Sequence, residues 1–155
     1  MISVDIRNDQ VRPVNRAAVR AFLKEAIRFL LPGGSWRVGL VFVEDDQITQ
    51  FNAKYLGEDR PTDVLAFSMR EGKALAGDAT FLGDIVISTE TAKRNAKRFR
   101  CSMERELALY LVHGLLHLLG YEDKTPSHRR RMRRKERAVL ERCRSVISLR
   151  SLVRP

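Results

Sequence analysis

The chain has 155 residues, of which 44% are hydrophobic and 31% are charged. These proportions exclude an intrinsically disordered chain, and the length predicts one domain, residues 1–155. The longest nearly apolar stretch, residues 107–119, is too short for a transmembrane helix, which needs about 20 residues. Asp5 and Arg7 place charge where a secretory signal would need an apolar stretch, so we expect a cytoplasmic protein with no membrane partner.

The hydrophobic pattern predicts an α+β fold, in which a small mixed sheet of about four strands packs with about five helices. The expected strands are residues 3–7, 36–43, 63–67 and 82–88. The expected helices open at Pro13, at a cap formed by Asp45 or Asp46, and at residues 90, 103 and 127. The last helix should carry an inward stripe that includes Val146. Residues 69–80 predict a hairpin or a flexible connection.

The apolar helix expected over residues 103–119 carries the clearest chemical signal. His113 and His117 are four residues apart, so both imidazoles project from one face, the spacing with which a helix presents two nitrogens to one metal ion. Two such histidines can instead be hydrogen-bonded core residues. Burial among leucines is costly for an imidazole without a partner, and Gly120 ends the helix in a turn that can return a carboxylate, so we favour a metal site.

Asp123 is the candidate third ligand. The spacing His113-x3-His117-x5-Asp123 gives two imidazoles and one carboxylate with a position left open for water, as in catalytic zinc sites, and it predicts a hydrolase. Gly114 stands where an HExxH metalloprotease helix carries its general-base Glu. A peptide substrate is therefore disfavoured.

Positive charge is concentrated at the end of the chain. Residues 124–155 contain 12 Lys and Arg against two Glu, a balance of +10, and residues 1–123 contain 17 of each sign. A solvated helix face is one interpretation of such a segment, because long basic side chains cover many helices. Contact with a polyanion is the other.

Several blocks of the sequence fall in a recognisable order. They are Asn52-x-x-Tyr55, Asp59-x-Pro61-Thr62-Asp63-Val64-Leu65-x-Phe67, Gly83-Asp-Ile-Val-Ile-Ser88, and His113-Gly-Leu-Leu-His117-Leu-Leu-Gly120-Tyr121 followed by Met132 and Glu136. Over essentially its full length the chain resembles the YbeY family of bacterial rRNA-maturation endoribonucleases.

The resemblance implies a metal-dependent endoribonuclease with one zinc ion, or another divalent metal, and with His113 and His117 as catalytic ligands. It also implies single-stranded ribosomal RNA as substrate, a role in small-subunit rRNA 3′-end maturation and ribosome quality control, and the small ribosomal subunit or its proteins as partners. RNA binding rests largely on phosphate contacts, which agrees with the +10 balance. The candidate RNA-binding residues are Arg129, Arg130, Arg133 and Arg134, and Glu136 is a candidate hydrogen-bond acceptor for a ligand histidine.

Two positions depart from the family pattern. Asp123 stands where the family usually has a third His, so a bound divalent ion keeps about +1 of local charge instead of +2 and becomes a weaker Lewis acid. His128 and Glu122 are alternative third ligands. Leu56 stands where the family usually has an Arg that is thought to serve RNA binding or catalysis, and Arg60 is the candidate catalytic cation that replaces it.

Two other classes of function stay open at this point. One is an assembly factor that binds rRNA or ribosomal proteins, with a structural metal and little nuclease activity, which the two departures favour. The other is a metallohydrolase with a small-molecule or peptide substrate, which Gly114 and the basic C-terminal segment disfavour.

Overall fold

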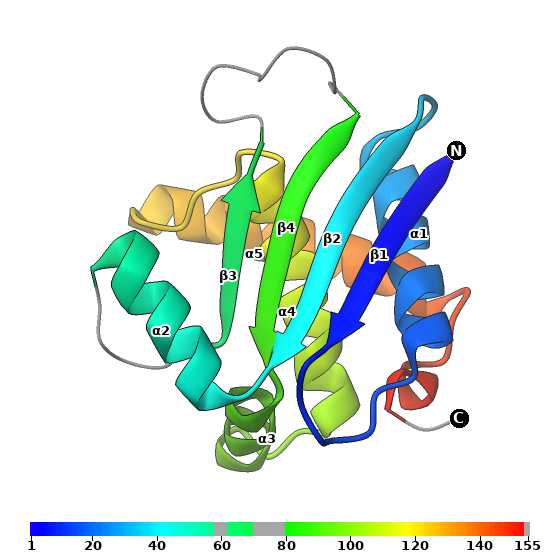
Figure 1. The fold of residues 1–155 in the computed structure, drawn as a ribbon. Helices are drawn as coiled ribbons and strands as arrows, with labels where there is room; N and C mark the ends of the chain where they lie inside the picture. Colours follow the sequence, from blue (N-terminus) through cyan, green and yellow to red (C-terminus); the bar gives the residue numbers. More distant parts are fainter. Residues whose placement is uncertain (58–61, 70–79, 154–155) are drawn as a thin grey trace.

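The computed structural model describes residues 1–57, 62–69 and 80–153 (Figure 1). They form four strands, five α-helices and one 3-10 helix, which confirms the expected α+β class. In chain order these are β1 (Ile2–Asn8), α1 (Arg16–Leu30), β2 (Trp36–Val43), α2 (Asp45–Leu56), β3 (Val64–Ser68), β4 (Phe81–Ser88), α3 (Thr89–Arg98), α4 (Met103–Leu118), α5 (Pro126–Arg144) and η1 (Leu149–Leu152).

The strands form one mixed sheet in the order β1-β2-β4-β3. β1, β2 and β4 run parallel, and β3 pairs antiparallel with β4 as an edge strand. Figure 1 shows α1, α4 and α5 behind the sheet, whereas α2 lies beside β3. No helix in the described ranges is long and apolar enough to span a membrane.

The main core lies between the sheet and the layer of α1, α4 and α5. β2 alternates in the expected manner, with its buried side chains turned to this layer; they are Val38, Leu40 and Phe42. A smaller cluster under α2 covers part of the opposite face and contains Val43, Ile48, Leu65 and Val86. The sheet is therefore packed on both faces near β3, where the candidate ligands lie.

Three expected boundaries were wrong. α1 begins at Arg16 with Asn15 as its cap, because the Asn15 carboxamide accepts from the backbone N–H of Ala18 at 3.2 Å. α2 is capped by Glu44, which forms a capping box with Gln47. α5 ends at Arg144, so the helical period no longer holds at Val146, and this side chain is 55% exposed. The connection expected over 69–80 lies almost wholly outside the described residues.

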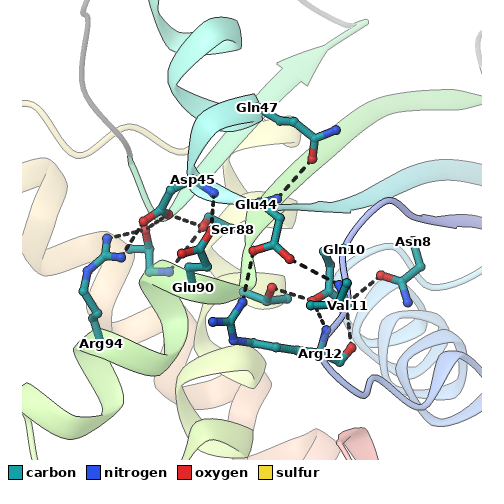
Figure 2. Close-up of polar contacts among 12 residues, drawn as sticks. Asn8, Gln10, Val11, Arg12, Glu44, Asp45, Gln47, Ser88, Glu90 and Arg94 are labelled. Carbon is teal, nitrogen blue, oxygen red and sulfur yellow. Dashed lines mark hydrogen bonds and ion pairs between the residues drawn. The ribbon is translucent and has the colours of Figure 1, made fainter.

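Asp45 is not the cap of α2 because its carboxylate is held elsewhere. Its oxygens accept hydrogen bonds from Ser88, Thr91 and Arg94 (Figure 2), which fasten the start of α2 to the start of α3. Burial alone would raise the pKa of Asp45, but the bonds from Ser88, Arg94 and Thr91 outweigh it and hold the pKa below its usual value. The Asp45 carboxylate thus links the segments that follow β2 and β4 through its hydrogen bonds.

Gly114 sets how closely α4 approaches the sheet. A Cβ at this position would lie 2.7 Å from Cγ2 of Ile85 on β4 and 3.1 Å from Cγ2 of Val64 on β3. Carbon atoms in contact are normally about 3.5–4.0 Å apart. The glycine therefore lets α4 sit directly against β3 and β4, and it fixes the height of the neighbouring histidines above the sheet.

The first prediction concerns this contact. Gly114→Ala should gain about 1 kcal/mol of helix propensity, but overpacking against Ile85 should cost about 1–3 kcal/mol, so we expect a lower urea midpoint. In an Ile85→Ala background, which removes the contacted methyl group, the same substitution should cost less or become favourable. An equal cost in both backgrounds would contradict the packing argument.

Candidate metal centre and the adjoining cleft

Two histidines project side by side from the last turns of α4. Ser102 caps this helix by accepting from the N–H of Arg105, and leucines bury its other faces. The imidazoles of His113 and His117 are 4.5 Å apart between ring centroids and nearly perpendicular. Their side chains are 23% and 28% exposed, so they are not core histidines but line an opening at the surface.

The turn after α4 brings the chain back toward these imidazoles. The N–H of Gly120 donates to His117 and that of Tyr121 donates to Leu116, the hydrogen-bond pattern of a Schellman motif. Gly120 has the expected positive φ of 93°, which a residue with a side chain adopts rarely. Thr125 then caps α5. Both ends of the short connection are therefore fixed by helix termini.

Asp123 lies in this connection, and its carboxylate meets both imidazoles. Its Oδ2 is 3.3 Å from Nε2 of His113 and 3.4 Å from Nε2 of His117, and the two Nε2 atoms are 3.0 Å apart. Tetrahedral zinc with bonds of about 2.0–2.1 Å would hold neighbouring ligand atoms roughly 3.3 Å apart. The three atoms thus have the spacing of one metal-binding triangle, and these residues could hold a metal ion.

Glu136 on α5 orients one of the histidines. Its Oε1 lies 3.2 Å from Nδ1 of His113, which assigns the ring proton to Nδ1 and leaves the Nε2 lone pair directed at the triangle. Burial lowers the pKa of His113, but the hydrogen bond and charge of Glu136, with the charges of Asp123 and Asp63, outweigh burial and raise it. The expected contact between Glu136 and a candidate ligand is therefore present.

The two alternative third ligands lie apart from the triangle. Nδ1 of His128 is 3.6 Å from Oε2 of Glu122, and these two residues form a separate pair at the surface. Of the three carboxylate and imidazole candidates after α4, the structure brings Asp123 to His113 and His117. The conformation of the connection thus places Asp123 beside both imidazoles, an arrangement that spacing in the sequence alone left open.

A cleft of about 590 Å³ opens beside the triangle. Its walls come from the end of α2, from β3 and from the connection after α4. They include Tyr55, Leu56, Phe67, Ser68, His117, Tyr121, Asp123 and Lys124. Tyr55 and Leu56 are 53% and 62% exposed, so two large apolar side chains face solvent beside the candidate metal ligands. Two members of the triangle, His117 and Asp123, thus line an open cleft.

The basic side chains of α5 have different positions around this centre. Arg129 turns back and donates to the backbone carbonyls of Asp123 and Lys124, at 3.4 and 3.2 Å. Arg131 lies over the ring of Tyr121, 5.3 Å from its centroid. The other three residues named from the sequence, Arg130, Arg133 and Arg134, are exposed, and Arg134 borders a groove with Tyr121 and Arg131. Arg60 lies outside the described residues.

Sequence reasoning missed Lys124 as a residue of the cleft and Arg131 as the partner of the Tyr121 ring. The signal for Lys124 was present, because it directly follows a candidate ligand in the chain. Arg131 was concealed by the continuous arginine run, in which no spacing distinguishes one residue from its neighbours. Leu56 was noted for the charge that it lacks, and the structure adds that its side chain forms a wall of the cleft.

Comparison with known proteins agrees with this geometry. Residues 3–144 match the family model described as endoribonuclease YbeY. The chain belongs to the YbeY family. Proteins named endoribonuclease YbeY are similar to it in Pelotomaculum thermopropionicum, with 49% identity over 71% of this chain and 74% of the relative, and in Halalkalibacterium halodurans, with 34% identity over 90% and 94%.

The fold is also similar to a solved structure. The solution structure of TM1509 from Thermotoga maritima is similar to this chain with a TM-score of 0.62 and 27% sequence identity. The match covers 94% of this chain and 90% of that protein. The arrangement of helices and sheet that carries the histidines is thus shared with a protein solved by experiment.

The second prediction follows from the raised pKa of His113. Because the folded state raises this pKa above its ordinary value of 6.5, protonation of His113 stabilises the metal-free protein below about pH 6.5, and this stabilisation is lost as pH rises through the folded-state pKa. Glu136→Gln should lower the pKa of His113 and reduce this pH dependence. Histidine NMR titrations of the metal-free wild type and variant would measure it.

Glu122→Gln is the matched control for the pH prediction, because it removes a carboxylate that pairs with His128 instead. The pKa of His113 should stay the same in this variant. An unchanged pKa of His113 in Glu136→Gln would show that Glu136 is not the cause of the shift.

Proposed function

We propose that this chain is a metal-dependent endoribonuclease that cleaves single-stranded RNA in the cytoplasm and uses one zinc ion held by His113, His117 and Asp123. Its substrate is small-subunit ribosomal RNA near the 3′ end, and its partners are the small subunit or its proteins, in a pathway of rRNA maturation and ribosome quality control. The chain acts as one domain, residues 1–155. Membership of a family named for endoribonuclease activity supports the reaction class.

One observation carries the proposal: three ligand atoms converge at the wall of an open cleft. Structural zinc sites have four protein ligands and are closed, whereas catalytic sites have three and leave a position for water or substrate. Here two imidazoles and one carboxylate are half-exposed beside a space of about 590 Å³. This arrangement favours catalysis over the alternative of an assembly factor with a structural metal.

The residues of the chain prepare the centre for hydrolysis of a phosphodiester. A bound divalent metal would supply a water of lowered pKa and polarise a phosphoryl oxygen. Glu136 holds the Nδ1 proton of His113, so Nε2 stays free to bind. Arg129 holds the carbonyls of the connection that carries Asp123. The apolar wall of Tyr55 and Leu56 offers surface on which an unpaired base can stack or pack.

The basic face of α5 is the proposed RNA-binding surface, with Arg129, Arg130, Arg133 and Arg134 as its candidate residues. The groove beside Tyr121, which Arg131 and Arg134 line, supports this path because it lies next to the cleft and shares Tyr121 with it. Arg60 stays a candidate catalytic cation.

The third prediction tests the metal-dependent nuclease. Wild-type protein should contain about one metal ion per chain and cleave single-stranded RNA, and a chelator should abolish cleavage until zinc is restored. His117→Ala and Asp123→Ala should lower metal affinity by more than the 10- to 100-fold typical of outer hydrogen-bond partners. Both should stay folded by circular dichroism, because buried leucines form the core around the centre.

Two further variants separate the possible third ligands and functions. Asp123→His should retain the ion, whereas His128→Ala is the control and should leave both metal content and cleavage unchanged. A dependence on His128 with no effect of Asp123→Ala would move the third ligand. Tight metal binding without cleavage of any RNA would favour the assembly factor.

The fourth prediction concerns the basic face of α5. Replacing Arg130, Arg133 and Arg134 with Gln should change stability little, because all three side chains are exposed. Three lost phosphate contacts should flatten the plot of log affinity for single-stranded RNA against log salt by about 2 units. Binding measured at several salt concentrations gives this slope.

The matched control removes three exposed charges from α3, by changing Lys93, Lys97 and Arg98 to Gln. Its slope should stay close to that of the wild type. A larger change in this control would place the RNA path along α3, and equal small changes in both variants would mean that the arginines of α5 form a solvated face.

A further inference from the structure

The described residues that line the cleft beside the metal triangle offer little positive charge for an enzyme that acts on a phosphodiester. A metal with two imidazoles and one carboxylate keeps about +1 of local charge. The wall from α2 ends in Leu56, and the wall from β3 contributes Val64, Leu65, Ala66, Phe67 and Ser68, all of them uncharged. The transition state of phosphoryl transfer carries its negative charge on the phosphoryl oxygens and needs fixed positive charge beside it.

Lys124 is the one cation among the described residues that line this cleft. Its Cα is about 3.8 Å from that of Asp123, since consecutive residues are joined by a trans peptide. The Oδ2 of Asp123 lies 3.3 Å from Nε2 of His113. The lysine side chain thus begins one residue from a candidate metal ligand and lines the same cleft.

The backbone of Lys124 is fixed, while its side chain is exposed. Arg129 donates to the carbonyl of Lys124 at 3.2 Å, and the next residue, Thr125, caps α5. Within the described part of the chain the Lys124 ammonium has no carboxylate partner, so its charge is not neutralised by an ion pair. A flexible stem on a fixed backbone lets a lysine follow a phosphate as a point charge.

We propose that Lys124 contacts the non-bridging oxygens of the RNA phosphate bound in this cleft and supplies the positive charge that the Leu56 wall lacks. This inference rests on the proposed nuclease function of the same site. It assigns the cation of the cleft to the connection after α4, instead of to Arg60.

Cleavage kinetics of the zinc-loaded protein on a single-stranded RNA test the assignment. Lys124→Gln should lower kcat by about 30-fold, the size of effect expected when one hydrogen bond from a charged group is lost. Its metal content should stay at the wild-type level. Lys124→Arg should retain most of the activity, and Lys93→Gln, which removes an exposed charge from α3, should match the wild type.

A second-site variant distinguishes charge in the cleft from a structural role of Lys124. Leu56 lines the same cleft from α2, so a new cation there should replace the lost charge. The double variant Leu56→Arg, Lys124→Gln should have a kcat at least tenfold higher than Lys124→Gln alone. Equal kcat values for Lys124→Gln and Lys93→Gln would overturn the proposal. So would loss of metal in Lys124→Gln, or a large loss of activity in Arg60→Gln with none in Lys124→Gln.

Binding of inorganic phosphate to the zinc-loaded protein provides a readout that needs no turnover. Calorimetry should show about tenfold weaker phosphate binding in Lys124→Gln than in Lys93→Gln, the effect of one lost charged contact. If the wild type cleaves no RNA but Lys124→Gln binds phosphate more weakly than Lys93→Gln, the nuclease proposal fails and the phosphate site stands. If RNA is cleaved and neither kcat nor phosphate affinity changes, the phosphate site fails and the nuclease stands.

Discussion

The close packing of α4 on the sheet at Gly114 is the constraint on which the candidate centre depends. With no side chain at this position, the helix packs on Ile85 and Val64, and His117 lines the cleft together with β3. A tightly packed interior cannot absorb an extra methyl group without movement of its parts. Gly114, which stands where a metalloprotease helix carries its general-base Glu, is thus also the residue that lets α4 pack directly on the sheet.

The connection after α4 supplies the third candidate ligand, Asp123, which a single helix carrying two histidines cannot provide. Two ligands four residues apart define only one edge of a coordination polyhedron, and a third must come from another segment. Here the Schellman turn at Gly120 and the cap at Thr125 hold that segment at both ends, with Arg129 bound to its carbonyls. Ligands held in place before the metal arrives need little ordering when it binds. The carboxylate of Asp123 is therefore held beside both imidazoles by the turn and the helix cap.

Local signals in the sequence were sufficient for the elements and for the histidine pair, because helical period, strand alternation and the i, i+4 spacing are properties of short segments. They failed where a side chain had a distant partner. Asp45 is a good helix cap by type, but Ser88 and Arg94 bind it instead, and Glu44 takes the cap. The cleft likewise requires α2, β3 and the connection to meet in space, so Leu56 could not be assigned to it from spacing, whereas Lys124 directly follows a candidate ligand in the chain.

The helix α5 presents two unlike surfaces along one axis. Glu136, Met132, Val139 and Cys143 turn inward, and the arginine run turns outward. The outer charges can therefore be changed without disturbing the inner face and its hydrogen bond to His113. The positive charge of the outer face and the orientation of His113 are thus encoded on opposite sides of the same nineteen residues.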